Sequence, residues 1–179
     1  TDENYPLNGD FNVVVVNTFA WDEPIAEILT AAEDLPRVSF YVTGKTERAS
    51  QEILESAPAN VHFTGYLADP SYFGLMTTSD SVMCLTTRDN TKQRGACQAL
   101  SLGKPIITSD WPLLREYFSN GTVHVSNSSE SIRKWVSELV NHYDSYENGI
   151  QELQTSQRRE WDRKLDDLMD LLRQSMPTT

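Results

Sequence analysis

The sequence has few basic residues for its acidity. Its 15 Lys and Arg residues stand against 26 Asp and Glu residues, which gives a net charge of −11 at pH 7. Nucleic acids and anionic membrane surfaces are negatively charged and attract proteins of the opposite sign. The charge balance therefore argues against both as the main partner of this chain, and we expect no nucleic-acid partner.

Long apolar runs are also missing. No stretch is apolar over the roughly 20 residues that a helix needs to cross a bilayer, so we expect no membrane span. Residues 1–10, TDENYPLNGD, have neither the basic start nor the apolar core of a signal peptide. We expect a cytoplasmic protein, and peripheral association of the full-length protein with the inner membrane stays open.

Cysteine and histidine are scarce. The two cysteines, Cys84 and Cys97, lie in apolar segments, which is typical of free thiols in a reducing compartment rather than of a disulfide framework. The three histidines are scattered, and none has a Cys or His partner at metal-ligand spacing. We therefore predict no metal site.

What remains is an ordinary globular composition with alternating strand and helix patterns. The 179 residues, 39% of them hydrophobic, suffice for one domain with a full core. This pattern predicts an α/β fold, a doubly wound, Rossmann-like, mainly parallel six-stranded sheet with extra C-terminal helices. We expect a single domain over residues 1–179. Residues 1–10 would form a lead or linker, residues 11–127 the core of alternating strands and helices, and residues 128–179 the C-terminal helices. We expect strands at 11–16, 38–43, 61–64, 82–86, 105–107 and 123–125, and helices at 25–35, 47–56, from 69, 96–102, from 112, 128–143 and 149–173.

Two of these helices carry more specific expectations. Asp22 is a candidate N-cap for the first helix, with Pro24 in its first turn. The last helix is highly charged and has one narrow apolar stripe, which predicts packing across the outside of the domain or onto a neighbouring one. The stripe consists of Trp161, Leu165, Leu168, Met169 and Leu172.

Residues 86–110 have the pattern of a ligand-binding stretch. A polar loop follows a buried strand and opens a helix, which is where open α/β sheets bind their ligands. The unpaired N–H groups at the start of a helix favour a phosphate or another anion. Lys92 and Arg94 add positive charge at this point. A solvated helix face is the alternative interpretation of these two cations.

The same stretch carries a family resemblance. Residues 98–107, QALSLGKPII, resemble the Glu-Ala-x-Ala-x-Gly-x-Pro-Val-Ile segment of the C-terminal donor-binding domain of GT-B glycosyltransferases, family four (group 1) type. Residues 61–67 resemble the strand and glycine that run beside the nucleotide base in that family, and residues 80–85 resemble another of its strands. The likeness covers most of the chain.

This resemblance implies a function. It implies the donor-binding half of a retaining glycosyltransferase of the hexosyltransferase type, as in polysaccharide biosynthesis. Such an enzyme moves a sugar from a UDP- or GDP-linked donor to a glycan or lipid-linked acceptor. The nucleotide-sugar is a substrate, so no cofactor is expected. The acceptor-binding N-terminal domain is missing here, and the chain alone is expected to be inactive.

The sequence also departs from the family pattern. The family's Glu-x7-Glu pair corresponds to Asn90 and Gln98, which keep hydrogen-bonding capacity without charge. Asp89 substitutes for the first carboxylate if the loop shifts by one residue. The two cations that neutralise the diphosphate after the family's first strand correspond to Thr18 and Glu23, so both are missing.

The candidate site follows from these correspondences. Catalytic candidates are Asn90 and Asp89, and no residue is assigned to a metal. Gly95 has the alternative role of a small residue for helix-on-sheet packing, and Lys45 that of a solvated turn lysine. A non-catalytic binding or scaffolding module is the alternative function, and a sugar-nucleotide 2-epimerase ranks below it. The donor-binding candidates are Gln98, Lys92, Arg94, Gly95, Lys45 and Tyr66.

Overall fold

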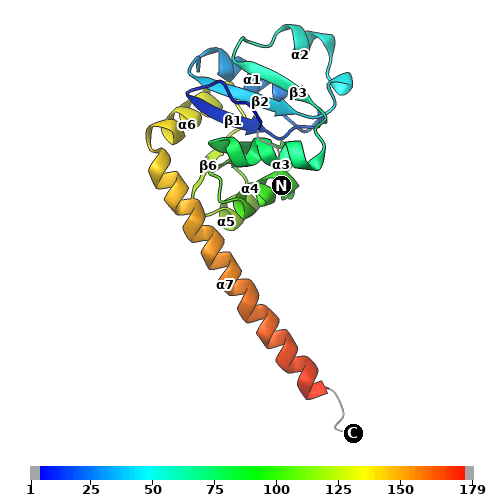
Figure 1. The fold of residues 1–179 in the computed structure, drawn as a ribbon, viewed down its shortest axis with the longest axis vertical. Helices are drawn as coiled ribbons and strands as arrows, with labels where there is room; N and C mark the ends of the chain where they lie inside the picture. Colours follow the sequence, from blue (N-terminus) through cyan, green and yellow to red (C-terminus); the bar gives the residue numbers. More distant parts are fainter. Residues whose placement is uncertain (1–4, 176–179) are drawn as a thin grey trace.

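The computed structural model describes residues 5–175, which form a six-stranded, all-parallel sheet with helices on both faces (Figure 1). The strand order is β3-β2-β1-β4-β5-β6. The predicted doubly wound, Rossmann-like fold is therefore confirmed, and the order reverses between β1 and β4. The strands are β1 Phe11–Val15, β2 Val38–Thr43, β3 Val61–Gly65, β4 Ser81–Cys84, β5 Ile106–Ser109 and β6 Thr122–Val125.

The central strands are buried on both faces. Every residue of β1, β2, β4 and β5 is buried, whereas β3 at the edge of the sheet is mostly half-buried. A strand covered on both sides needs apolar side chains in both directions, which explains the continuous apolar runs in the sequence. These runs located all six strands to within a few residues.

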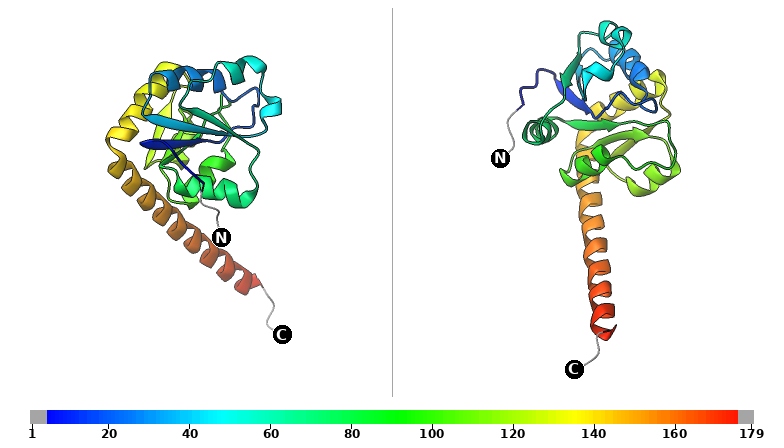
Figure 2. Two further views of the ribbon diagram at one scale, coloured as in Figure 1. Left: turned by 45° about the horizontal axis from the view of Figure 1, so that its top comes forward. Right: turned by 90° about the vertical axis from the view of Figure 1, so that its right-hand side faces the viewer.

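Two helical layers cover the sheet (Figure 2). Helices α1 and α6 pack on one face, around Ile28 and Ile132. Helices α3, α4, α5 and the start of α7 pack on the other, around Leu75, Ala99 and Ile150. The helices are α1 Ile25–Glu33, α2 Gln51–Glu55, α3 Asp69–Thr78, α4 Arg94–Ser101, α5 Pro112–Tyr117, α6 Ser129–Asn141 and α7 Tyr143–Ser175, with a short 3-10 turn η1 at Thr46–Arg48.

Two predicted helix starts differ from the structure. Asp22 does not cap α1: the N-cap is Pro24, which has no side-chain cap. The carboxylate of Asp22 instead accepts a hydrogen bond from Thr86. The predicted helix at 47–56 is divided into η1 and α2, because Ala49 and Ser50 between them have extended backbones. The side chain of Ser50 then caps α2.

The last helix begins at Tyr143 rather than at Gly149. Gly149 lies inside α7 and is buried where the helix crosses Asn120 and Gly121. A Cβ atom on Gly149 would lie 2.4 Å from Asn120 Oδ1 and 2.7 Å from the amide nitrogen of Gly121. This glycine therefore permits a close backbone crossing and does not mark the end of a helix.

Beyond this crossing, α7 leaves the domain (Figures 1 and 2). Ile150 and Leu153 are buried in the core, whereas every residue of 158–173 is exposed. The predicted apolar stripe therefore lies on the part of the helix that no described residue covers. Within residues 5–175, no helix is long and apolar enough to cross a membrane.

We predict that Gly149→Ala destabilises the protein. Alanine favours a helix over glycine by about 1 kcal/mol, but here its Cβ meets backbone, and overpacking of this kind costs about 1–3 kcal/mol or more. Urea unfolding should show a net decrease in the free energy of unfolding. Asn148→Ala, at the exposed neighbouring position, is the matched control and should be neutral or stabilising. An unchanged or higher stability of Gly149→Ala would contradict the close crossing.

Candidate functional site

The candidate site lies at the carboxyl edge of the sheet, where the strand order reverses. The loops that follow β1 and β4 are neighbours there, because these two strands pair directly. Ligands of open α/β sheets bind in the crevice at this reversal. A polar residue ends or closely follows each of four strands: Asn17, Thr86, Ser109 and Asn127.

Thr86 joins four loops at this edge. Its Oγ1 donates to Asp22 Oδ2 at 2.8 Å, and its amide donates to Ser109 Oγ at 2.8 Å. Its carbonyl oxygen accepts from Trp111 Nε1 and from Asn127 Nδ2, both at 2.9 Å. Ser109 Oγ in turn donates to Asn127 Oδ1 at 2.7 Å. The loops after β1, β4, β5 and β6 are thus held in one hydrogen-bonded network, which we call the Thr86 network.

The loop after β1 is closed by a carboxylate of its own. Glu23 accepts hydrogen bonds from the amide of Thr18 at 2.7 Å and from the amide of Ala20 at 2.9 Å. The hydroxyl of Thr18 also donates to it, at 3.1 Å. Asn17 Oδ1 supports the turn by accepting from the amide of Phe19, whose φ is 57°. Converging amides of this kind form a concavity that binds anions. Here Glu23 occupies it.

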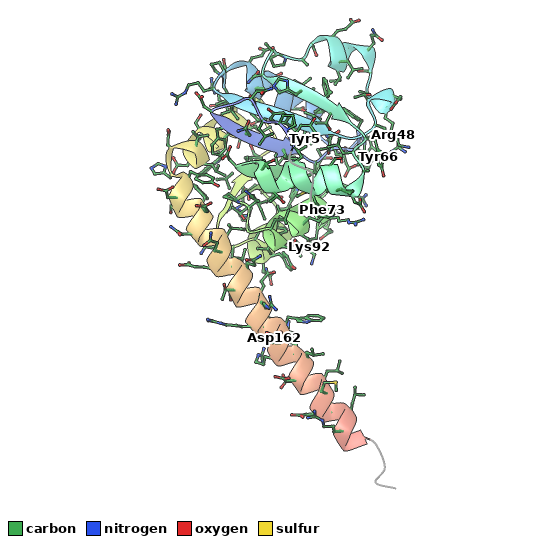
Figure 3. The ribbon with its side chains drawn as sticks, in the orientation of Figure 1. Tyr5, Arg48, Tyr66, Phe73, Lys92 and Asp162 are labelled. Carbon is green, nitrogen blue, oxygen red and sulfur yellow. The ribbon has the colours of Figure 1, made fainter. Side chains whose placement is uncertain are left out.

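The predicted cations do not gather at one point. Lys92 Nζ lies 3.8 Å from the centre of the Tyr117 ring, and Lys45 Nζ lies 5.7 Å from the centre of the Tyr66 ring. Figure 3 shows Tyr66 well apart from Lys92. The predicted residues therefore form two groups, one at the ends of β2 and β3 and the other between β4 and α4.

Arg94 differs from the other cations of the site. It is the first residue of α4 and is exposed, and its side chain makes no hydrogen bond or ion pair within residues 5–175. The start of α4 has no side-chain cap, so its first amides are open as well. Next to it, Gln93 donates from Nε2 to the carbonyl of Leu85 at 2.9 Å. Gln93 Oε1 is buried without a partner among the described residues, and the sequence alone did not single it out.

The remaining candidates have local partners. Gln98 Oε1 accepts from the hydroxyl of Tyr72 at 3.1 Å, and burial raises the pKa of Tyr72, so that this phenol stays a donor. Asn90 Nδ2 donates to Asp89 Oδ1 at 2.9 Å, and both residues are exposed. A Cβ atom on Gly95 would lie 2.8 Å from Cys84 Sγ, so close packing by itself accounts for this glycine. The functional roles of all these residues stay predictions.

One further carboxylate, Asp110, lies at the rim. Arg115 forms an ion pair with Asp110, and its hydrogen bond holds the pKa of that carboxyl below the usual range. Asp110 therefore stays charged just beyond β5. Within residues 5–175, no three His, Cys, Asp or Glu side chains form a group that could hold a metal ion.

A family model matches most of the chain. The family described as glycosyl transferase-like matches residues 23–170. A comparison with curated proteins found no significant match.

Solved structures share the fold at low sequence identity. The HepE protein of Anabaena, in complex with UDP and glucose, has a TM-score of 0.71 at 16% identity over 90% of this chain. Sucrose-phosphate synthase from Thermosynechococcus elongatus has a TM-score of 0.68, also at 16% identity over 90% of this chain. The pneumococcal O-GlcNAc transferase GtfA, in complex with UDP and GlcNAc, has a TM-score of 0.62 at 13% identity over 89%.

This likeness shows a shared fold, of the GT-B glycosyltransferase type. The chain spans only part of each of these proteins: 48% of HepE, 47% of the synthase and 36% of GtfA.

We predict that Glu23→Ala opens the amide concavity to an external anion. The amides of Thr18 and Ala20 lose their carboxylate partner, and a repelling negative charge leaves the rim. Binding of inorganic pyrophosphate should tighten by roughly tenfold or more, in line with the strength of charge-assisted hydrogen bonds. An NMR titration would follow the amide signals of Thr18 and Ala20.

Glu27→Ala is the matched control for this titration. Glu27 is exposed on α1, one turn beyond Glu23, and its removal changes the net charge by the same amount. If both variants gain affinity equally, the effect comes from net charge and not from the concavity. If neither amide signal moves in Glu23→Ala, the concavity does not bind anions.

Proposed function

The chain belongs to the glycosyl transferase-like family, and on that premise we propose that it is the donor-binding half of a retaining GT-B glycosyltransferase. The donor is a nucleotide-sugar linked to UDP or GDP, and the acceptor is a glycan or a lipid-linked glycan. The acceptor site comes from a separate N-terminal domain of the full-length protein, so the domain alone is inactive.

One observation carries the proposal. At the reversal of the strand order, the uncapped start of α4 and the unpartnered guanidinium of Arg94 lie together. Open amides and a free cation favour a diphosphate at this point. The unpaired Gln93 Oε1 adds an acceptor for a ligand hydroxyl or amine beside it.

The structural relatives support this choice of ligand. HepE and GtfA are complexes with UDP and a sugar, and both share the fold of this chain. The chain spans less than half of each protein. This share is what one nucleotide-binding half of a two-domain enzyme would cover.

The proposed reaction needs no cofactor, because the nucleotide-sugar is itself a substrate. As the sugar is transferred, negative charge develops on the leaving diphosphate, and preorganised amides and Arg94 stabilise that charge in the transition state. Asn90 and Gln98 contribute hydrogen bonds to sugar and ribose hydroxyls, with Asp89 as the carboxylate of the loop. Lys92 contributes a second cation if it moves off the Tyr117 ring. Lys45 and Tyr66 contact the base at the ends of β2 and β3.

A non-catalytic binding or scaffolding module is the second candidate. The observation that favours it is that the carboxylate of Glu23 occupies the amide concavity of the loop after β1, where an anionic ligand would otherwise bind. The uncharged Asn90 and Gln98 point the same way, since neither can act as a base or hold a charge.

We predict that the domain binds UDP or GDP and that Arg94→Ala weakens this binding by roughly 10- to 100-fold. A hydrogen bond to a charged group contributes about 1.5–3 kcal/mol, which corresponds to that range. Titration with UDP, GDP and ADP, followed by thermal stability and amide shifts, measures the affinities. Arg37→Ala removes an equally exposed arginine just before β2, at the opposite edge of the sheet, and should leave them unchanged.

The outcomes separate the candidates. No response to any nucleotide at millimolar concentration would contradict donor binding. If the full-length protein transfers sugar and loses transfer in Arg94→Ala or Lys92→Ala, the non-catalytic module is excluded. Nucleotide binding without transfer by the full-length protein would favour that module.

A further inference from the structure

Gln93 carries a buried polar atom that the chain itself does not use. Its Nε2 donates to the carbonyl oxygen of Leu85 at 2.9 Å, whereas its Oε1 is buried and has no hydrogen-bond partner within residues 5–175. A buried acceptor without a donor is costly, and native structures contain few of them. The missing donor is one that a ligand can supply.

The neighbour of Gln93 fixes the chemical character of this atom. The carbonyl oxygen of Leu85 can only accept a hydrogen bond, so the NH₂ group of the Gln93 amide must face it. Oε1 then faces away from Leu85 and can only accept. A diphosphate presents acceptor oxygens and offers no donor to Oε1, whereas a sugar hydroxyl or an acylamino N–H does.

Gln93 is held at both of its ends. It is the N-cap of α4, and its main-chain carbonyl accepts from the amide of Cys97 at 3.3 Å. Its side chain is bonded to Leu85, which directly follows β4 and precedes Thr86. A side chain held in this way loses little conformational freedom when a ligand binds, so it is suited to discriminate between ligands.

The loop before Gln93 is less firmly held. Residues 88–92 are mostly exposed. Their hydrogen bonds within the described part of the chain are local: the amide of Arg88 donates to Thr86 Oγ1 at 3.2 Å, and Asn90 Nδ2 donates to Asp89 Oδ1 at 2.9 Å. Loops with so few bonds open more readily than the strands that they join. We therefore expect a ligand to reach Oε1 through a shift of this loop.

The strand order puts Gln93 on the sugar side of the proposed ligand. Lys45 and Tyr66, the candidates for contact with the base, directly follow β2 and β3, and Arg94 lies at the reversal between β1 and β4. A nucleotide-sugar with its base at β2 and β3 and its diphosphate at Arg94 extends its sugar toward β4 and β5. Gln93 is bonded to the residue that follows β4.

From these observations we propose that Gln93 determines specificity for the transferred sugar, because its Oε1 accepts a hydrogen bond from one hydroxyl or acylamino group of that sugar. This inference rests on the function proposed above and adds which part of the ligand Gln93 contacts. A sugar without a donor at that position binds weakly, since Oε1 then stays buried and unpaired. A sugar with a carboxylate there is rejected as well, because two acceptors face each other.

A double-mutant cycle with modified ligands tests this role. UDP, UDP-glucose and analogues in which fluorine replaces one glucose hydroxyl at a time are titrated calorimetrically against the wild type and Gln93→Met. Fluorine does not donate, so one replacement should weaken binding to the wild type by roughly 5- to 100-fold, the effect of leaving a buried acceptor unpaired. In Gln93→Met that same replacement should have little effect, and the affinity for UDP should stay unchanged. GDP-mannose is the parent ligand instead if the chain binds GDP more tightly than UDP.

The matched control is Gln151→Met, the same substitution at an exposed position of α7, two residues beyond Gly149. It should bind every ligand as the wild type does. Gln93→Ala repeats the cycle if Gln93→Met does not fold.

The outcomes separate this inference from the proposed function. UDP binding without any hydroxyl coupled to Gln93 overturns the inference alone. An equal loss of affinity for UDP and UDP-glucose in Gln93→Met also overturns it, because the side chain then only supports the start of α4. A chain that binds neither UDP nor GDP overturns the proposed function together with the inference.

Discussion

The arrangement of the candidate site depends on the hydrogen bonds of one residue, Thr86. Its amide, carbonyl and hydroxyl groups are all bonded, and their partners come from the loops after β1, β5 and β6. A strand end normally leaves such groups to water, but here they fix four loops relative to one another. A ligand therefore meets a preformed edge, which costs less ordering on binding than a mobile one.

The charges at the carboxyl edge of the sheet then decide which ligands it can bind. The chain is strongly acidic, and Glu23 and Asp110 place negative charge on the rim itself. Of the predicted cations near α4, Lys92 rests on an aromatic ring, whereas the side chain of Arg94 has no hydrogen-bond or ion-pair partner among the described residues. The proposed affinity for a diphosphate thus rests on a small number of groups, and we expect the substitution of one carboxylate to change it substantially.

The fold was predictable because strands buried on both faces leave continuous apolar runs in the sequence, as residues 38–43 illustrate. Two of the errors involve partners that are remote in sequence. Asp22 has the composition of a helix cap, but it bonds Thr86, 64 residues away. Gly149 suggests a helix boundary, but the side chain of Asn120 and the backbone of Gly121 are what require a glycine. The polar residues at the ends of the buried strands can be read from the sequence, but the bonds of the Thr86 network join residues 23 to 64 positions apart and could not be predicted from it.

The anchorage of α7 connects its projecting part to the helix that carries Arg94. The buried first part of α7 contacts α4. Gln154 Nε2 donates to the carbonyl of Ser101, the last residue of α4, at 2.7 Å, and Ile150 packs in the same hydrophobic core as Ala99. Beyond these contacts, α7 projects from the domain, and its residues 158–173 are all exposed. The helix that α7 contacts, α4, ends at this contact and carries Arg94 at its opposite end. Whatever contacts the projecting part of α7 is therefore separated by only one further helix, α4, from the edge of the sheet that carries Arg94.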